Sequence, residues 1–144
     1  MISSLERNDR MRSMIIKQRE LVKDLCDSSV FITEDSQRFY YNLLEYIENH
    51  THKEIYTIPL LRQAIKTTNN DDLLKVVQFF SGGGSKFFDI KYCYEQEDRQ
   101  YIEIPFEEYN NYILNNQEPV DINGVELEDF NPKYLSFYCL INLD

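Results

Sequence analysis

A glycine-rich segment is the first place in this 144-residue sequence where residue types could do chemistry. Ser81, Gly82-Gly83-Gly84, Ser85 and Lys86 have the composition of a phosphate-binding loop. Such a loop follows a strand and precedes a helix, because the helix N-terminus holds the phosphate. Here the hydrophobic pattern predicts a helix before the glycines and a strand after them. We therefore interpret the segment as a connector and expect no nucleotide cofactor.

Histidine offers no better catalytic or metal site. His50 and His52 are the only two histidines, and they lie two residues apart near a predicted helix end. Zinc sites use three or four well-spaced ligands, and no such spacing is present. The sequence also lacks the Gly-X-Ser-X-Gly and His-Glu-X-X-His motifs of hydrolases. We expect no metal ion.

Paired acids are the remaining candidates for catalysis. Glu107-Glu108 and Glu128-Asp129 fall in segments predicted to be exposed. A general acid or base needs a cleft that perturbs its pKa, and solvated charge is the simpler interpretation of such pairs. We therefore expect a protein that is not an enzyme.

The cysteines and the N-terminus indicate a cytoplasmic protein. Cys26, Cys93 and Cys139 are odd in number and widely spaced, which is typical of free thiols in a reducing compartment. The charged first 12 residues do not have the pattern of a secretory signal. No apolar run reaches the roughly 18 residues that a membrane span needs.

Charge is unevenly distributed along the chain. Residues 1–86 contain 12 Lys and Arg against 12 Asp and Glu, whereas residues 87–144 contain 3 against 13. The whole net charge of -10 therefore lies in the C-terminal part. Such a part repels nucleic acid and attracts basic protein surfaces. Surface charge chosen only for solubility is the alternative interpretation.

Helical periodicity dominates the first half. Residues 5–25 form an amphipathic helix with Gln18 in its apolar stripe, and this helix either docks on its own domain or dimerises. Thr33, Asp35 or Ser36 caps a second helix that ends near residue 49. Thr57 caps a third helix, and Asn70 caps a fourth, which the glycines terminate in a left-handed conformation.

Strand periodicity follows. Residues 88–95 and 101–106 alternate apolar and polar side chains, with a polar turn at 96–99 and Pro105 near the strand end. A short helix is predicted over 107–116. Asn123-Gly124 predicts a type I′ hairpin, and residues 135–143 form a final strand. The fold class is α+β, with N-terminal helices followed by antiparallel strands.

The order of these elements over residues 35–106 resembles the winged-helix superfamily. We expect a single domain, 1–144, with an amphipathic helix at 1–25, a winged-helix-like core at 35–116, and a β-hairpin and strand at 117–144. The resemblance implies that the helix over 71–81 enters a DNA groove or that the domain binds protein. That helix carries Lys75 against Asp71 and Asp72, which is unfavourable for phosphate contacts. A DNA-binding regulator using Arg62, Lys66, Lys75 and Lys86 is the alternative function.

A protein-binding module fits the charge better. The chain has 11 Tyr and no Trp, and tyrosine is enriched at interfaces because it joins an apolar ring to a polar tip. We predict that an acidic, tyrosine-rich surface engages a basic protein, blocking or assembling a nucleic-acid-handling complex, with a homodimer through the N-terminal helix as a further alternative. The predicted surface consists of Tyr92, Tyr94, Glu95, Glu97, Asp98, Tyr101, Glu103, Glu107, Glu108 and Tyr109.

Overall fold

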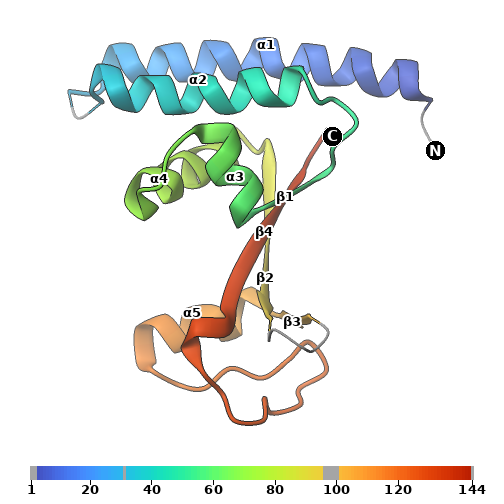
Figure 1. The fold of residues 1–144 in the computed structure, drawn as a ribbon, viewed down its shortest axis with the longest axis vertical. Helices are drawn as coiled ribbons and strands as arrows, with labels where there is room; N and C mark the ends of the chain where they lie inside the picture. The colour runs from blue at the N-terminus through green and yellow to red at the C-terminus, as the bar shows by residue number, and fades with distance from the viewer. Residues whose placement is uncertain (1–2, 31, 96–100, 144) are drawn as a thin grey trace. The chain divides into compact units, whose positions relative to one another are not determined.

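The computed structural model describes residues 3–30, 32–95 and 101–143, and the chain divides into two compact units (Figure 1). The helical unit comprises residues 1–89 and 140–144, and the acidic unit comprises residues 90–139. The fold is α+β, with N-terminal helices followed by antiparallel strands, as the sequence predicts. None of the helices in the described ranges is long and apolar enough to cross a membrane.

Four helices build most of the helical unit. They are α1 (Ser4–Ser28), α2 (Glu34–Glu48), α3 (Ile58–Ile65) and α4 (Asn70–Ser81). Figure 1 shows α1 and α2 lying side by side and running in opposite directions. The apolar stripe of α1 is buried within this unit, where Met11, Ile15 and Val22 are at most 2% exposed.

Each of these helices begins with a side-chain cap. Ser3, Thr33, Thr57 and Asn69 each accept a hydrogen bond from the backbone N–H three residues ahead. Such caps satisfy an N–H group that the helix itself leaves unpaired. The prediction for Thr57 is confirmed, and of the three candidates predicted for α2, Thr33, Asp35 or Ser36, it is Thr33 that caps the helix. The prediction for Asn70 is wrong by one residue, because Asn69 has the extended backbone that a cap requires.

The glycine segment ends α4, but not by the predicted left-handed conformation. Gly82 has φ of -71°, and an added Cβ would lie 3.2 Å from the Gln78 carbonyl oxygen, which is a tight contact. The left-handed residue is Lys86, with φ of 53°. Between them Ser85 is buried, and its hydroxyl donates to the Phe80 carbonyl oxygen or to Gln18 Oε1. The segment therefore works as a fixed connector.

The end of the chain lies inside the sheet. The sheet contains β1 (Ile55–Thr57), β2 (Phe88–Tyr94), β3 (Ile102–Ile104) and β4 (Leu135–Ile141), in the order β1-β4-β2-β3. Within the helical unit, Ile141 N–H donates to the Glu54 carbonyl oxygen and Asn142 N–H to that of Phe87. The last residues therefore connect the segments at β1 and β2, a placement that periodicity along the chain does not predict.

The acidic unit is built on the β2–β3 pair. The two strands are antiparallel, with Tyr92 opposite Ile104 and Cys93 opposite Glu103. The predicted second strand, 101–106, is too long by one residue at its start and two at its end, where Pro105 precedes α5 (Phe106–Asn115). The predicted polar turn at 96–99 lies outside the described residues. A 3-10 turn, Pro132–Tyr134, leads into β4.

The turn at Asn123-Gly124 is a hairpin turn of a different type from the prediction. A type I′ turn requires positive φ at both residues, but only Gly124 has it, with φ of 80°. Gly124 N–H donates to the Asp121 carbonyl oxygen, and Asp121 N–H donates to that of Val125. This is a three-residue loop with glycine in the left-handed position, closed by a single bridge between Val120 and Glu126.

A buried hydroxyl in β1 gives the first testable prediction. Tyr56 is fully buried, and its Oη has no hydrogen-bond partner among the described residues. Tyr56→Phe is expected to leave the free energy of unfolding unchanged or raise it by up to about 1 kcal/mol, because an unpaired buried hydroxyl destabilises the folded state. Urea unfolding measures this. Tyr94→Phe is the opposite case, because the Tyr94 hydroxyl accepts a hydrogen bond from Asn131 N–H. This substitution should lower the free energy of unfolding by about 1–2 kcal/mol.

Candidate protein-binding face

The β2–β3 pair has two faces, and the face that carries Tyr92 and Tyr94 is internal to the acidic unit. Tyr92 and Tyr94 lie two residues apart and so share this face. The Tyr92 ring stacks on Tyr109 of α5 with centroids 4.2 Å apart and lies 5.8 Å from Phe106. Burial raises the pKa of both Tyr92 and Tyr109. These two predicted contact residues therefore join α5 to the strands.

Tyr94 belongs to the core of the unit. It is 2% exposed, and its ring stacks on Phe130 at 5.6 Å and meets Tyr134 edge-on at 5.9 Å. Its hydroxyl accepts a hydrogen bond from Asn131 N–H at 2.9 Å. The prediction that Tyr94 lies on an open surface does not agree with this burial, since no partner can reach it without opening the core.

The second face of the pair carries the tyrosine and acidic residues that remain accessible. Cys93 lies opposite Glu103, and continuing the register by two positions places Glu95 opposite Tyr101. The rings of Tyr101 and Tyr138 lie 5.5 Å apart, and the two hydroxyl groups are hydrogen-bonded. Glu95, Tyr101 and Glu103 are exposed. We call Glu95, Tyr101, Glu103 and Tyr138 the acidic tyrosine face.

Ionisation on this face follows from its packing. Cys93 is buried, and burial together with the neighbouring Glu95 raises the pKa of its thiol. A hydrogen bond with Ser136 lowers the pKa in part, and the net result is a pKa of about 11. The pKa of Tyr101 is raised by desolvation and by its hydrogen bond with Tyr138. The thiol and the phenol are therefore neutral near pH 7. The negative charge of the face comes from its two carboxylates.

The other predicted acids have different positions. Glu107 is exposed in the first turn of α5. Glu108 has a structural role, because its Oε1 accepts a hydrogen bond from Val120 N–H at 2.9 Å and so ties α5 to the Gly124 hairpin. Glu97 and Asp98 lie outside the described residues. Of the predicted residues, the structure therefore brings together Glu95, Tyr101 and Glu103, and it adds Tyr138 to them.

Exposed apolar side chains accompany the acids. Among the described residues of the acidic unit, six large hydrophobic side chains are 44–70% exposed: Tyr101, Phe106, Ile113, Leu114, Ile122 and Val125. Ile122 N–H donates to the Glu103 carbonyl oxygen, so the hairpin loop adjoins β3. Sequence reasoning predicted Tyr101 but missed the other five residues, although Ile113-Leu114 at the end of a short helix was an available signal.

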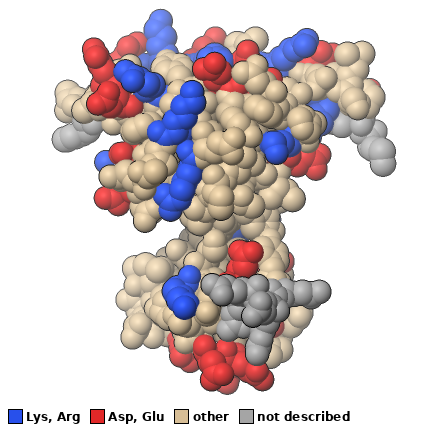
Figure 2. Space-filling view, in the orientation of Figure 1, with Lys and Arg blue, Asp and Glu red and all other residues tan. Residues whose placement is uncertain are grey.

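Charge within the acidic unit has one predominant sign. Residues 90–139 contain three Lys and Arg against eleven Asp and Glu, a net charge of -8. On the face drawn in Figure 2, red carboxylate side chains gather on this unit and blue side chains are few. Exposed apolar groups on a unit whose charge has one predominant sign are typical of sites that bind a partner of the opposite sign.

The cationic residues of the helical unit are differently arranged. Figure 2 shows a short row of Lys and Arg side chains across the visible face of this unit. Arg62 is held by the α3–α4 turn, where its guanidinium donates to the Thr68 carbonyl oxygen and to Asn70 Oδ1. Lys66, Lys75 and Lys86 are exposed. Of the four residues predicted for DNA contact, the three lysines are therefore accessible to a ligand, whereas the Arg62 guanidinium is hydrogen-bonded within the α3–α4 turn.

The histidines take part in local packing. His50 Nδ1 lies 2.7 Å from the Tyr46 carbonyl oxygen, and the His50 ring stacks on Tyr46 at 4.0 Å. Within the part of the chain that the structure describes, no group of three or more His, Cys, Asp and Glu side chains lies together as metal ligands would.

Comparison with known proteins adds no further information about this site. No protein-family model, no curated protein and no solved structure has a significant match to this chain.

Proposed function

We propose that the chain is a non-enzymatic protein-binding module whose acidic unit engages a basic surface on another protein. One observation carries this proposal: six large apolar side chains stand exposed in a unit of net charge -8. Apolar side chains supply contact area, whereas the surrounding carboxylates steer a basic partner and reject acidic ones.

Tyr101 is the proposed anchor of this contact. Its ring is 44% exposed but is held by Tyr138, so little side-chain freedom is lost when a partner covers it. Glu95 and Glu103 flank it on the same face of the strands. A basic partner that presents Arg can pair with these carboxylates and stack on the Tyr101 ring. Blocking or assembling a nucleic-acid-handling complex is one role for such a contact.

We also propose that the helical unit is a winged-helix-like scaffold. Support comes from the order α2, β1, α3, α4, β2, in which a short strand precedes a pair of helices. Residues 140–144 then join the segments at β1 and β2 through backbone hydrogen bonds. On this interpretation the residues between β2 and β4 replace a simple wing. The odd number and wide spacing of the three cysteines favour a reducing compartment such as the cytoplasm.

Charge reversal on the acidic tyrosine face tests the proposed function. The immobilised protein should capture basic proteins from a lysate at low salt, and raising the salt should weaken capture strongly because the contact is electrostatic. Glu95→Lys plus Glu103→Lys should abolish this capture, and Tyr101→Ala should weaken it by about tenfold or more, as expected for an aromatic anchor. Quantitative mass spectrometry of the captured proteins measures both effects.

The matched control is Glu20→Lys plus Asp24→Lys, which makes the same change of charge on the exposed side of α1. This control should capture the same proteins as the wild type. Two outcomes would contradict an electrostatic contact on the acidic unit. One is that the amount of captured protein does not change with salt concentration, and the other is that the two double variants lose capture to the same extent.

DNA binding by the helical unit is the second candidate, favoured by the row of cationic side chains in Figure 2. It requires that wild-type protein retard duplex DNA at low salt and that Lys66→Glu plus Lys75→Glu remove the retardation. Arg62 is unsuitable for this test, because its substitution would also disturb the α3–α4 turn. No retardation at low salt would exclude this candidate.

A further inference from the structure

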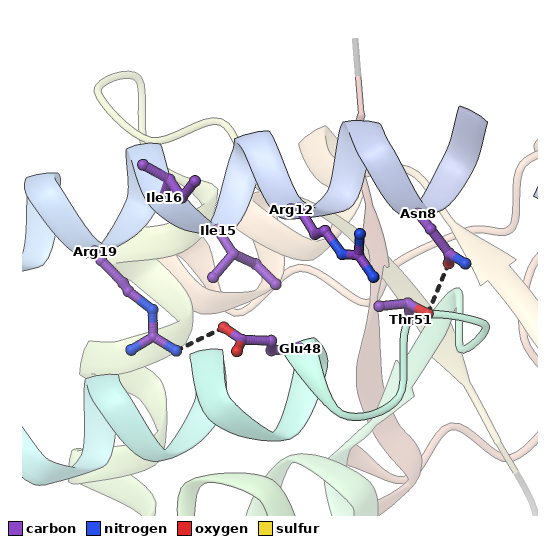
Figure 3. A pocket seen from close by; sticks show the side chains of 7 residues that line it. All are labelled: Asn8, Arg12, Ile15, Ile16, Arg19, Glu48 and Thr51. Atoms are coloured by element: carbon purple, nitrogen blue, oxygen red, sulfur yellow. Dashed lines mark hydrogen bonds and ion pairs between the residues drawn. The ribbon is translucent and has the colours of Figure 1, made fainter. Parts of the chain in front are cut away.

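A groove of about 350 Å³ lies in the helical unit between α1 and the C-terminal end of α2. It is lined by Asn8, Arg12, Ile15, Ile16, Arg19, Glu48 and Thr51 (Figure 3). Its volume lies at the lower end of the range of about 300–1,000 Å³ found for small-molecule sites. The groove belongs to neither of the surfaces described above, so an inference about it is independent of the proposed function.

Polar contacts between the two segments fix the groove at both ends. At one end Thr51 Oγ1 donates to Asn8 Oδ1 at 2.8 Å, and at the other Arg19 pairs with Glu48 at 2.8 Å. These two contacts join α1 directly to the C-terminal end of α2 and the residues after it, so the two walls are held at a set separation. A preformed site of this kind loses little freedom on binding, which favours affinity for a small ligand.

Between these ends the groove carries one unneutralised positive charge. Figure 3 shows the Arg12 side chain extending from α1 toward Thr51, with Ile15 pointing to α2 beside it. Among the described residues Arg12 forms no hydrogen bond or ion pair. Since Glu48 neutralises Arg19, the charged groups of the groove sum to +1. Ile15 is 2% exposed and provides an apolar floor.

We propose that this groove binds a small monocarboxylate with a short apolar body. The planar guanidinium of Arg12 matches the two oxygens of a carboxylate, which it can hold through parallel hydrogen bonds. The apolar body then lies against Ile15, toward the Arg19–Glu48 pair. A more highly charged anion is disfavoured, because it would exceed the charge of Arg12 and approach the Glu48 carboxylate.

Titration with hexanoate tests the proposal, with amide chemical shifts of the ¹⁵N-labelled full chain as the readout. Hexanoate should shift the amide signals of Asn8, Arg12 and Thr51 saturably, with a Kd on the order of 1 mM for so small a ligand. Hexanol, which lacks the charge, and inorganic phosphate, which lacks the apolar body, should each bind at least about tenfold more weakly.

Arg12→Gln should weaken hexanoate binding by about tenfold or more, whereas Arg10→Gln, an exposed arginine of α1 outside the groove, should not change it. Both residues are on the surface, so the spectra of the variants also report that the fold is kept. Absence of saturable shifts in the wild type, equal binding of hexanol and hexanoate, or unchanged binding by Arg12→Gln would each overturn the proposal.

Discussion

Phe80→Ala is expected to lower the free energy of unfolding by about 3–5 kcal/mol, the cost of removing a large aromatic ring from a packed core. Phe80 is fully buried at the centre of an aromatic cluster. Its ring centroid lies 5.0 Å from that of Phe79 and 6.2 Å from those of Tyr40, Phe87 and Phe88. The substitution therefore removes favourable edge-to-face contacts as well as buried area.

Urea unfolding followed by circular dichroism measures this loss. Because domains have a total stability of only about 5–15 kcal/mol, the variant is expected to be marginally folded. Phe106→Ala is the matched control, since the same ring is removed from a position that is 56% exposed. It should cost less than about 1 kcal/mol. Equal losses for the two variants would mean that Phe80 is not the centre of a tightly packed core.

The helices could be predicted from the sequence because their signals are local. The apolar spacing of a helix indicates its position, and for α2, α3 and α4 a Thr or Asn just before the helix indicates its start. Thr57 was identified correctly on this basis, and Thr33 was one of three candidates for the cap of α2. For α4 two adjacent asparagines offered the same chemistry, and only the backbone conformation distinguishes Asn69 from Asn70.

The position of the last strand could not be predicted in the same way. Alternation of side chains identifies β4 as a strand but carries no information about which strands it pairs with. Its placement between β1 and β2 depends on contacts between residues far apart in the chain, such as Ile141 with Glu54. Arg62 is a different case, because its partners Thr68 and Asn70 are only six and eight residues further along the chain, but apolar periodicity does not tell how the α3–α4 turn folds back on it.

The candidate face was predicted in part for a related reason. Alternation along β2 correctly groups Tyr92 with Tyr94, but it does not tell which face of the strand α5 will cover. Covering this face leaves Glu95, Tyr101 and Glu103 accessible, with Tyr138 from β4 completing the set. Alternation therefore groups the residues that share a strand face, and packing decides which of these groups remains accessible.

Gln18→Glu is expected to destabilise the helical unit by about 3 kcal/mol or more at pH 7, because it places a charge where water cannot solvate it. Gln18 is fully buried in α1. Its Nε2 donates to the Ser85 carbonyl oxygen at 3.3 Å, and its Oε1 accepts from the Ser85 hydroxyl at 2.5 Å. Glutamate has nearly the same shape, but as a carboxylate it loses the donor and faces the Ser85 carbonyl oxygen.

The loss should depend on pH in a direction that the packing determines. Burial raises the pKa of such a glutamate above its ordinary value of about 4.3, so the folded chain binds its proton more tightly than the unfolded chain. The penalty is therefore small below about pH 4, where both states are protonated, and grows as the pH rises through the folded-state pKa.

The control variant Gln18→Met has a side chain of similar length and no charge. It should lower the free energy of unfolding by about 1–2 kcal/mol, and this decrease should not depend on pH. Chemical unfolding of both variants between pH 4 and pH 8 separates the cost of the charge from that of the lost hydrogen bonds. A pH-independent loss for Gln18→Glu would mean that water reaches this position and that α1 is not sealed against the Ser85 connector.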